Sequence, residues 1–281
     1  MINKLILFGS NGMLGRYIST YFKDKQGLQV ISISRMEFEI TSDSITHLEQ
    51  FLSSFDLDEN TCIINCNGLI PQRVTNKNNS DYYITNTIFP LQLSKICQRY
   101  QAKLICPTTD CVFSGRKGNY TESDYHDESN AYGISKSLGE PFHATVIRTS
   151  IIGEEIDNKT SFLEFVKNSS GTIQGWTNHE WNGITCYEYC KVIEKILHQN
   201  LFWTGTRHLF SPEKRSKYEL ACIIKNAYQL AIHIEPRETP NKVDKTLTSI
   251  YDTNSLFCIP SLEDQIYQQA QYTLLKVQHD K

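Results

Sequence analysis

The feature that most constrains the fold of this chain is a short apolar run that ends in three evenly spaced glycines. Residues 5–8 read Leu-Ile-Leu-Phe, and Gly9, Gly12 and Gly15 follow as a helix-like stretch over residues 12–23 begins. A buried parallel strand that turns sharply into a helix presents backbone N–H groups and the positive end of the helix dipole to a pyrophosphate. The segment therefore predicts a dinucleotide-binding β–α turn.

Each glycine has its own predicted role in that turn. Gly9 permits the turn itself, and Gly12 lets the phosphates approach the backbone because it has no side chain. Gly15 lets the first helix pack close to the strand. Since glycines also punctuate ordinary loops, the motif gains its weight from the strand before it and the helix after it.

Strand-like and helix-like segments alternate over the first half of the chain. Such alternation is typical of a Rossmann-type α/β fold, a doubly wound parallel sheet covered on both faces. We therefore assign residues 1–152 to a Rossmann domain that binds the dinucleotide. The predicted strands are residues 5–8, 29–34, 62–65, 103–107 and 145–148, and the predicted helices are residues 12–23, 81–99 and 131–142.

The second half of the chain has a less regular pattern. We predict that residues 153–281 form mainly a smaller α/β substrate-binding lobe, and that a segment near residues 183–211 returns to the Rossmann domain. The predicted elements there are polar loops at 154–159 and 175–183 and helices at 183–199, 217–229 and 262–276.

Composition excludes several classes of function. The 281 residues carry a net charge of −3 without blocks of Lys or Arg, so no electrostatic footprint for nucleic acid or a membrane surface is present. No stretch approaches the roughly 20 apolar residues that span a bilayer. The nine cysteines are scattered, and the pair at Cys186 and Cys190 has no second pair at metal-ligand spacing. We expect a cytoplasmic protein with reduced thiols and no metal.

The end of the second predicted strand indicates which cofactor fits. Residues 32–35 read Ser-Ile-Ser-Arg, with no Asp or Glu at the tip. An acidic residue there would bind the ribose hydroxyls of NAD, whereas an arginine can pair with the 2′-phosphate of NADP. Arg35 therefore favours NADP(H) over NAD(H).

Three residues form a candidate catalytic group. Thr109 follows the fourth predicted strand, and Tyr132 and Lys136 lie one helical turn apart. We expect the ammonium of Lys136 to lower the pKa of Tyr132, which would make the phenol a usable acid or base, and to hold the cofactor ribose. Thr109 can hydrogen-bond the reacting oxygen and align a carbonyl with a hydride donor.

Spacing alone does not identify this tyrosine. Two further Tyr-x-x-x-Lys pairs occur, at Tyr187/Lys191 and at Tyr272/Lys276. Only Tyr132 follows both a glycine-rich first turn and a strand-end hydroxyl, in the order that brings all three features to one site. We interpret the other two pairs as amphipathic helix surface.

These residues resemble those of the extended short-chain dehydrogenases/reductases, and specifically the dTDP-4-dehydrorhamnose reductase family. The resemblance extends over nearly the whole chain. It rests on the glycine turn, Asn65-Cys66-Asn67-Gly68, Asn86, Thr109-Asp110-Cys111-Val112-Phe113, Tyr132-Gly133-Ile134-Ser135-Lys136, Val146-Ile147-Arg148-Thr149 and Asp244-Lys245-Thr246-Leu247.

The resemblance implies a reaction and a set of contacts. In the family, NADPH delivers hydride to C4 of a nucleotide-linked 4-keto-6-deoxy sugar, for deoxysugar and surface-polysaccharide synthesis, and the tyrosine protonates the forming alkoxide. Similar proteins often dimerise through the helices that carry the tyrosine and its neighbour. The implied substrate-binding residues are Asp110, Cys111, Trp181, Asn182 and Thr185. The implied cofactor-binding residues are Gly9, Asn11, Gly12, Met13, Leu14, Gly15, Arg35, Asn67, Gly68, Asn86, Tyr132 and Lys136.

The chain departs from the family pattern at Cys111, where a tyrosine is usual. A cysteine at this position resembles the GDP-fucose synthase pattern, in which it serves as an acid/base for epimerisation before reduction. His179 and His126 are the candidates for its partner. A 4,6-dehydratase is disfavoured because Cys111 replaces the glutamate of its Asp-Glu pair. A further alternative is a non-catalytic NADP-binding role, as in a regulatory subunit of methionine adenosyltransferase.

Overall fold

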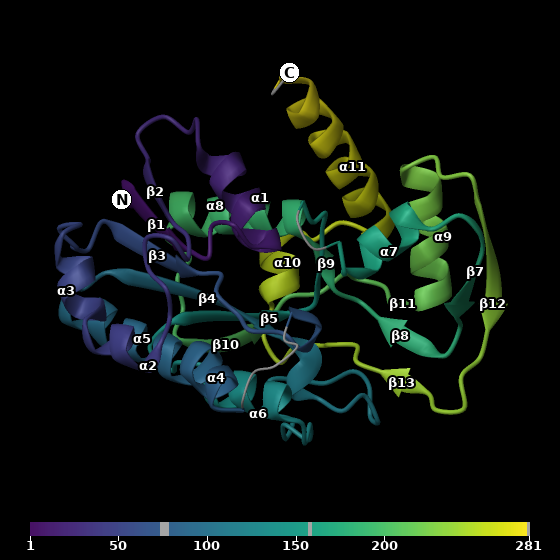
Figure 1. Ribbon diagram of the computed structural model, residues 1–281, viewed down its shortest axis with the longest axis horizontal. Helices are drawn as coiled ribbons and strands as arrows, with labels where there is room; N and C mark the ends of the chain where they lie inside the picture. The colour runs from purple at the N-terminus through teal and green to yellow at the C-terminus, as the bar shows by residue number, and fades with distance from the viewer. Residues whose placement is uncertain (74–78, 157–158, 280–281) are drawn as a thin grey trace. The chain divides into compact units, whose positions relative to one another are not determined.

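The computed structural model describes residues 1–73, 79–156 and 159–279. The chain divides into two compact units, which we call the first and second units (Figure 1). The first contains Met1–Val112, His126–Arg148 and Ile193–Arg207, and the second contains Phe113–Tyr125, Thr149–Val192 and His208–Lys281. Assignment of the cofactor to one and the substrate to the other stays a prediction.

A six-stranded sheet forms the centre of the first unit. Strand β1 pairs in parallel with β2 and β3, and β3 pairs in parallel with β4. All five residues of β3 are buried, as expected for an apolar strand covered on both faces. This arrangement confirms the predicted α/β class. The strand order is β10-β5-β4-β3-β1-β2, with bounds β1 Lys4–Phe8, β2 Gln29–Ile33, β3 Thr61–Asn65, β4 Lys103–Thr109, β5 Thr145–Thr149 and β10 Gly205–His208.

Helices cover both faces of this sheet (Figure 1). On one face lie α2 to α6, and on the other lie α1 and the C-terminal part of α8. The buried core on the first face packs Phe8, Ile33 and Leu104 of the strands against Leu52 of α3 and Phe89 of α5. The bounds are α1 Met13–Phe22, α2 Ser42–Thr46, α3 Leu48–Ser53, α4 Asn79–Tyr83, α5 Phe89–Arg99, α6 Ala131–Leu138 and α8 Cys186–Gln199.

Two predicted helices of this unit differ from the structure. The stretch expected as one helix over residues 81–99 consists of α4, a π-helical turn at Ile84–Ile88, and α5. The helix expected to reach residue 142 ends at Leu138. A Cβ atom on the next residue, Gly139, would lie 1.7 Å from the carbonyl oxygen of Asn86, so the chain is held against the π-helical turn there.

The second unit contains three small sheets, with strand orders β11-β8-β13, β12-β7 and β6-β9. Its core includes Leu163, Trp181, Leu220 and Ile266. The bounds are β6 Ile151–Ile152, α7 Phe162–Asn168, β7 Gly171–Trp176, β8 His179–Trp181, β9 Ile184–Thr185, β11 Arg215–Ser216, α9 Lys217–Ala227, β12 Ile232–Arg237, β13 Val243–Asp244, α10 Thr253–Phe257 and α11 Leu262–His279.

Some element boundaries predicted from the sequence for the second unit were wrong. The polar loop expected at 175–183 contains the end of β7 and all of β8. The helix expected from residue 183 begins at Cys186, because Ile184 and Thr185 pair in parallel with β6. The helix expected over 217–229 ends at Ala227. Part of the loop expected at 154–159, namely residues 157–158, lies outside the described residues.

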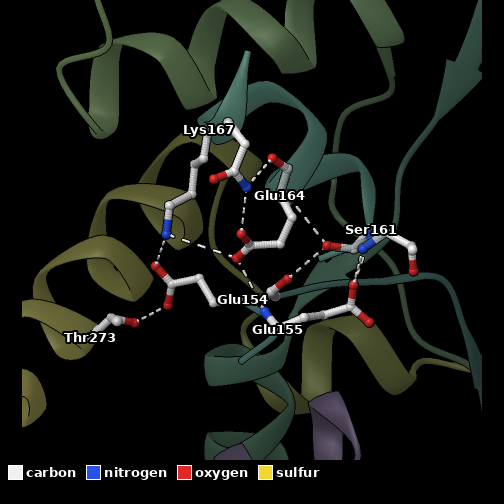
Figure 2. A network of polar contacts seen from close by, with 9 residues as sticks. Glu154, Glu155, Ser161, Glu164, Lys167 and Thr273 are labelled. Atoms are coloured by element: carbon white, nitrogen blue, oxygen red, sulfur yellow. Dashed lines mark hydrogen bonds and ion pairs between the residues drawn. The ribbon is translucent and has the colours of Figure 1, made fainter. Parts of the chain in front are cut away.

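A network of charged side chains stabilises the second unit beside α7 (Figure 2). Lys167 donates to Glu154 across 2.8 Å, and Thr273 of α11 donates to the same carboxylate. The N–H of Glu155 donates to Glu164 across 3.1 Å, and the N–H of Ser161 donates to Glu155 across 2.8 Å. These contacts hold residues 154–155 against α7 and α11. Among the described helices, none is long and apolar enough to cross a membrane.

Candidate active site

The glycine turn lies where the carboxyl ends of β1, β2 and β3 meet. Gly9 has a φ of +75°, a conformation that L side chains rarely adopt. Its N–H donates to the carbonyl of Ile33 across 2.9 Å. A Cβ atom at Gly9 would lie 2.9 Å from both the N and the Oδ1 of Asn67. Only glycine therefore fits at this junction, which is where open α/β sheets bind their ligands.

The two later glycines have different surroundings. The start of α1 is open at Gly12, and α1 packs closely against the turn at Gly15. Gly12 is the N-cap of α1, and a Cβ atom there would have only the Gly9 carbonyl oxygen near it, at 3.3 Å. A Cβ atom at Gly15 would lie 2.1 Å from that same oxygen. A helix N-terminus whose backbone is not covered by a side chain at Gly12 fits a pyrophosphate. The residues present therefore suit a dinucleotide.

The neighbouring residues of the turn contribute in different ways. Asn11 is exposed, and its carbonyl accepts a 2.9 Å hydrogen bond from the Nε of Arg16. Met13 is partly buried at the start of α1, and Leu14 is buried in the core. Met13 and Leu14 can thus donate hydrogen bonds to a ligand through their backbone N–H groups at this helix start.

The tip of β2 carries an acidic group that sequence reasoning missed. Arg35 is exposed and follows Ser34 directly, as expected. The carboxylate of Glu37, however, folds back to accept hydrogen bonds from the N–H and the hydroxyl of Ser34, at 2.7 Å and 2.5 Å. These hydrogen bonds lower the pKa of Glu37. The Ser-x-x-Glu spacing of a capping box was the available signal.

Asn86 joins the loop after β3 to α6. It lies in the π-helical turn, is 2% exposed, and accepts a 2.8 Å hydrogen bond from the N–H of Leu69. Its Nδ2 donates to the Leu69 carbonyl and to the Ser135 hydroxyl, both at 3.0 Å. The loop held in this way includes Asn67 and Gly68. The structure thus gives Asn86 a positioning role, while cofactor contact by these residues stays a prediction.

The structure brings Thr109 and Tyr132 together. Thr109 is the last residue of β4, and its hydroxyl lies close enough to the Tyr132 phenol to affect the pKa of that group. Tyr132 lies at the start of α6, whose N-cap Asn130 accepts a 2.8 Å hydrogen bond from the N–H of Gly133. The ring of Tyr82 packs edge-on against that of Tyr132, with 6.2 Å between centroids. The phenol is therefore held at the carboxyl end of β4.

The predicted direction of the tyrosine pKa shift was wrong. Burial raises the pKa of Tyr132 above its ordinary value, the Cys111 thiol adds to the rise, and the hydrogen bond from Thr109 opposes it. Burial also lowers the pKa of Lys136, whose charge is favoured by Glu140 and three nearby cysteines. Tyr132 is consequently a protonated phenol at neutral pH, as a proton donor must be.

Asp110 and Cys111 form a turn directly after Thr109. The N–H of Cys111 donates to the Thr109 hydroxyl oxygen across 3.1 Å, and that hydroxyl is 3.2 Å from a carboxylate oxygen of Asp110. Asp110 is 4% exposed, whereas Cys111 is partly exposed. Cys111 contributes to the raised pKa of Tyr132 and partly opposes the lowering of the pKa of Lys136.

The two histidines considered as partners of Cys111 have other contacts. His126 has its Nε2 2.8 Å from a guanidinium nitrogen of Arg148 and its Nδ1 2.6 Å from the Ser137 hydroxyl. Because a guanidinium only donates, Nε2 accepts and Nδ1 carries the proton. Burial accordingly lowers the pKa of His126. His179, in the second unit, has its Nε2 2.8 Å from the Thr239 hydroxyl.

The three predicted substrate residues of the second unit are buried. Trp181 is 5% exposed and lies under the ammonium of Lys217, which is 5.0 Å from the ring centroid. The amide of Asn182 exchanges hydrogen bonds of 2.8 Å and 2.9 Å with the backbone of Leu247. The hydroxyl of Thr185 accepts from the N–H of Glu188 across 3.1 Å at the start of α8. Their predicted contact with substrate stays a prediction.

The other two Tyr-x-x-x-Lys pairs lie in the second unit. Lys191 is ion-paired with Glu188, and the ring of Tyr187 stacks on that of Tyr272 at 4.5 Å between centroids. The side chain of Lys276 lies outside the described residues. Among the side chains that the structure describes, no cluster of three His, Cys, Asp or Glu could hold a metal ion.

Comparison with known proteins identifies the family. Residues 3–276 match the sequence model described as the RmlD substrate binding domain. The chain belongs to the RmlD substrate binding domain family. The family predicted from the motifs is thereby confirmed.

The relatives of this chain include proteins named as reductases and proteins named as a subunit of another enzyme. A dTDP-4-dehydrorhamnose reductase from Mycobacterium tuberculosis is 25% identical over 158 residues, 52% of this chain and 49% of that protein. The methionine adenosyltransferase 2 subunit beta from Rattus norvegicus is 24% identical over 259 residues, 83% of this chain and 75% of that protein. The chain thus spans about half the length of the first of these relatives.

A solved structure shows that the fold of the RmlD family extends over the whole chain. The dTDP-4-dehydrorhamnose reductase from Bacillus anthracis, solved in complex with NADP, superimposes with a TM-score of 0.77 at 22% identity. The match covers 95% of this chain and 97% of that one. The predicted Rossmann-type fold is confirmed by this likeness and by the parallel sheet.

Proposed function

We propose that this protein is an NADPH-dependent reductase of the C4 ketone in a nucleotide-linked 4-keto-6-deoxy sugar. The observation that carries the proposal is the placement of Tyr132 and Lys136 one turn apart on α6, with the Tyr132 phenol beside Thr109 at the end of β4. The reductase names of its relatives support the substrate class. Synthesis of a deoxysugar for a surface polysaccharide follows from the family resemblance.

The residues divide the chemistry among themselves. A bound nicotinamide cofactor supplies hydride to the carbonyl carbon. Thr109 donates a hydrogen bond to the carbonyl oxygen and aligns it, and Tyr132 transfers its phenolic proton to that oxygen. Lys136 holds the cofactor ribose and stabilises the phenolate that remains. Ketone, hydride and proton together give the alcohol, so no further reactant is needed.

The glycine turn and Arg35 support a phosphate-bearing dinucleotide as cofactor. The open start of α1 is built for the pyrophosphate, and Arg35 carries a cation at the end of β2. The NADP bound by the Bacillus anthracis structure agrees with this assignment. Recognition of the sugar nucleotide by Trp181, Asn182 and Thr185 is carried by the resemblance alone.

The test compares two tyrosines of the same sequence pattern. NADPH oxidation is followed with a panel of dTDP-, UDP-, GDP- and CDP-linked 4-keto-6-deoxy sugars. Tyr132→Phe should bind NADPH normally and lose most turnover, because the ring still packs but no proton donor remains. Tyr187→Phe, in the second Tyr-x-x-x-Lys pair, should keep full activity. Near-normal turnover in Tyr132→Phe would refute Tyr132 as the proton donor. Tight NADPH binding without reduction of any sugar would instead favour a binding-only role like that of a regulatory subunit.

A second activity, epimerisation before reduction, is favoured by the position of Cys111. Its thiol is partly exposed, and its N–H donates to the hydroxyl oxygen of Thr109 across 3.1 Å. A thiolate there can remove a proton from a carbon next to the ketone, and a separate acid such as water must then donate a proton to the opposite face for the centre to invert. In deuterated water the wild type should then incorporate deuterium at C3 or C5. Cys111→Ser should abolish the label, whereas Cys258→Ser, at an exposed cysteine, should retain it.

A further inference from the structure

The tip of β2 lies directly beside the glycine turn. The carbonyl of Ile33, the last residue of β2, accepts hydrogen bonds from the N–H groups of Gly9 and Ser10, at 2.9 Å and 3.2 Å. Ser34 is therefore the first residue beyond β2, next to the predicted pyrophosphate cradle. In dinucleotide-binding folds this point meets the adenosine ribose.

Ser34 offers two hydrogen-bond donors at this point, and one carboxylate oxygen takes both. The N–H and the hydroxyl of Ser34 donate to Glu37 Oε2 across 2.7 Å and 2.5 Å. Arg35 lies between the two residues in sequence and is exposed. Two convergent donors beside a guanidinium form an arrangement that suits a phosphate. Here the protein's own carboxylate occupies the donors.

A purely structural reading of these contacts is a capping box, which this spacing resembles. The contacts cap no helix, however. The carbonyl of Ser34 accepts one hydrogen bond of 3.1 Å from the N–H of Phe38, and the next helix, α2, begins only at Ser42. Glu37 itself is exposed, so its charge faces solvent and any ligand at this tip. The carboxylate is thus placed to affect binding as well as the local turn.

We propose that Glu37 is a specificity-determining residue that competes with the 2′-phosphate of NADP for the two donors of Ser34. The inference rests on the proposed cofactor site. A ribose 2′-hydroxyl can donate to Glu37 without disturbing it, whereas a 2′-phosphate must displace the carboxylate or bear its repulsion. Arg35 attracts the phosphate and Glu37 opposes it, so the cofactor preference of the wild type is smaller than Arg35 alone would give.

The test measures binding of two nucleotides that differ only in the 2′-phosphate. Isothermal titration calorimetry on the full chain uses 2′,5′-ADP and 5′-AMP with the wild type, Glu37→Gln and Glu37→Ala. Removing a unit charge a few ångströms from a phosphate at a partly solvated site should tighten 2′,5′-ADP by about tenfold. The affinity for 5′-AMP should fall or stay within about twofold, because the hydroxyl acceptor is weakened.

A matched control removes the same charge two residues away. Glu39 is exposed and lies beyond the turn, so Glu39→Gln should leave both affinities within about twofold. An unchanged ratio of the two affinities in both Glu37 variants, or an equal shift in Glu39→Gln, overturns the proposal. If neither nucleotide binds the wild type, the cofactor site and the proposed function fail with it. Binding of both nucleotides with an unaltered ratio overturns only the role of Glu37.

Discussion

Replacing Gly15 by alanine tests the physical reading of the glycine turn. A Cβ atom there would lie 2.1 Å from the Gly9 carbonyl oxygen, 2.9 Å from the Gly9 carbonyl carbon and 3.0 Å from the Cα of Ser10. All three neighbours are backbone atoms, so no side chain can rotate away, and α1 must separate from the turn by about 1 Å. Such overpacking costs about 3 kcal/mol, whereas helix propensity favours alanine by at most about 1 kcal/mol. We expect a net loss of about 2 kcal/mol in stability.

Urea unfolding and nucleotide titration together check this expectation. Gly15→Ala should lower the free energy of unfolding and weaken binding of 5′-AMP and NADPH by about tenfold or more, because a displaced helix start loses at least one hydrogen bond to phosphate. The control is Ser19→Ala on the same helix, where stability should change by less than about 0.5 kcal/mol. Propensity alone would make Gly15→Ala the more stable protein. A stabilised variant with unchanged nucleotide binding would refute the close-packing account.

Three further changes probe the first unit. Arg148→Met leaves the carboxylate of Glu140 buried without its 2.5 Å partner and should lower the free energy of unfolding, measured in urea, by about 3–5 kcal/mol. Adding Glu140→Gln in a double variant should restore part of that loss. Asn86→Ala removes both hydrogen bonds to Leu69 and should lower the free energy of unfolding by about 2–3 kcal/mol. It should also weaken NADPH binding, and an unchanged NADPH affinity in calorimetry would contradict the positioning role. The raised pKa of Tyr132 means that the folded protein holds this proton more tightly than the unfolded chain, so its stabilising contribution is complete below pH 10 and is lost as the pH rises further. An ultraviolet difference titration against Tyr132→Phe should therefore show a tyrosine that ionises above pH 10, and ionisation below that value would contradict it.

Local backbone requirements explain what the sequence could predict. The positive φ of Gly9 and the close approach at Gly15 depend on residues within one turn, so the glycine spacing with its flanking strand and helix patterns predicted them. Tyr132 and Lys136 were proposed as a pair because a helix brings positions four apart to one face and because they follow the glycine turn and Thr109 in the chain. The apolar run of β1 is buried throughout Leu5, Ile6 and Leu7, as continuous hydrophobicity predicts for a central strand.

Contacts between distant segments explain what the sequence could not predict. The end of α6 at Leu138 depends on Gly139 meeting the carbonyl of Asn86, more than fifty residues earlier. The raised pKa of Tyr132 depends on burial, which outweighs the charge of a lysine at the expected spacing. Local patterns carry no measure of such burial, so the sign of the shift was predicted incorrectly.

The tip of β2 shows why residue type at a strand end is an incomplete guide to cofactor choice. The sequence rule examines the residue at the tip, where Ser34 and Arg35 indicate a phosphate site. Folding brings a third group to that point, because a flexible Glu37 side chain can reach back to two donors that would otherwise be unpaired. The carboxylate reaches the tip because it satisfies two hydrogen-bond donors three residues away, which a rule that examines the tip residue alone does not consider. Cofactor preference in such a turn depends on which anion, the protein's own or the ligand's, binds those donors more tightly.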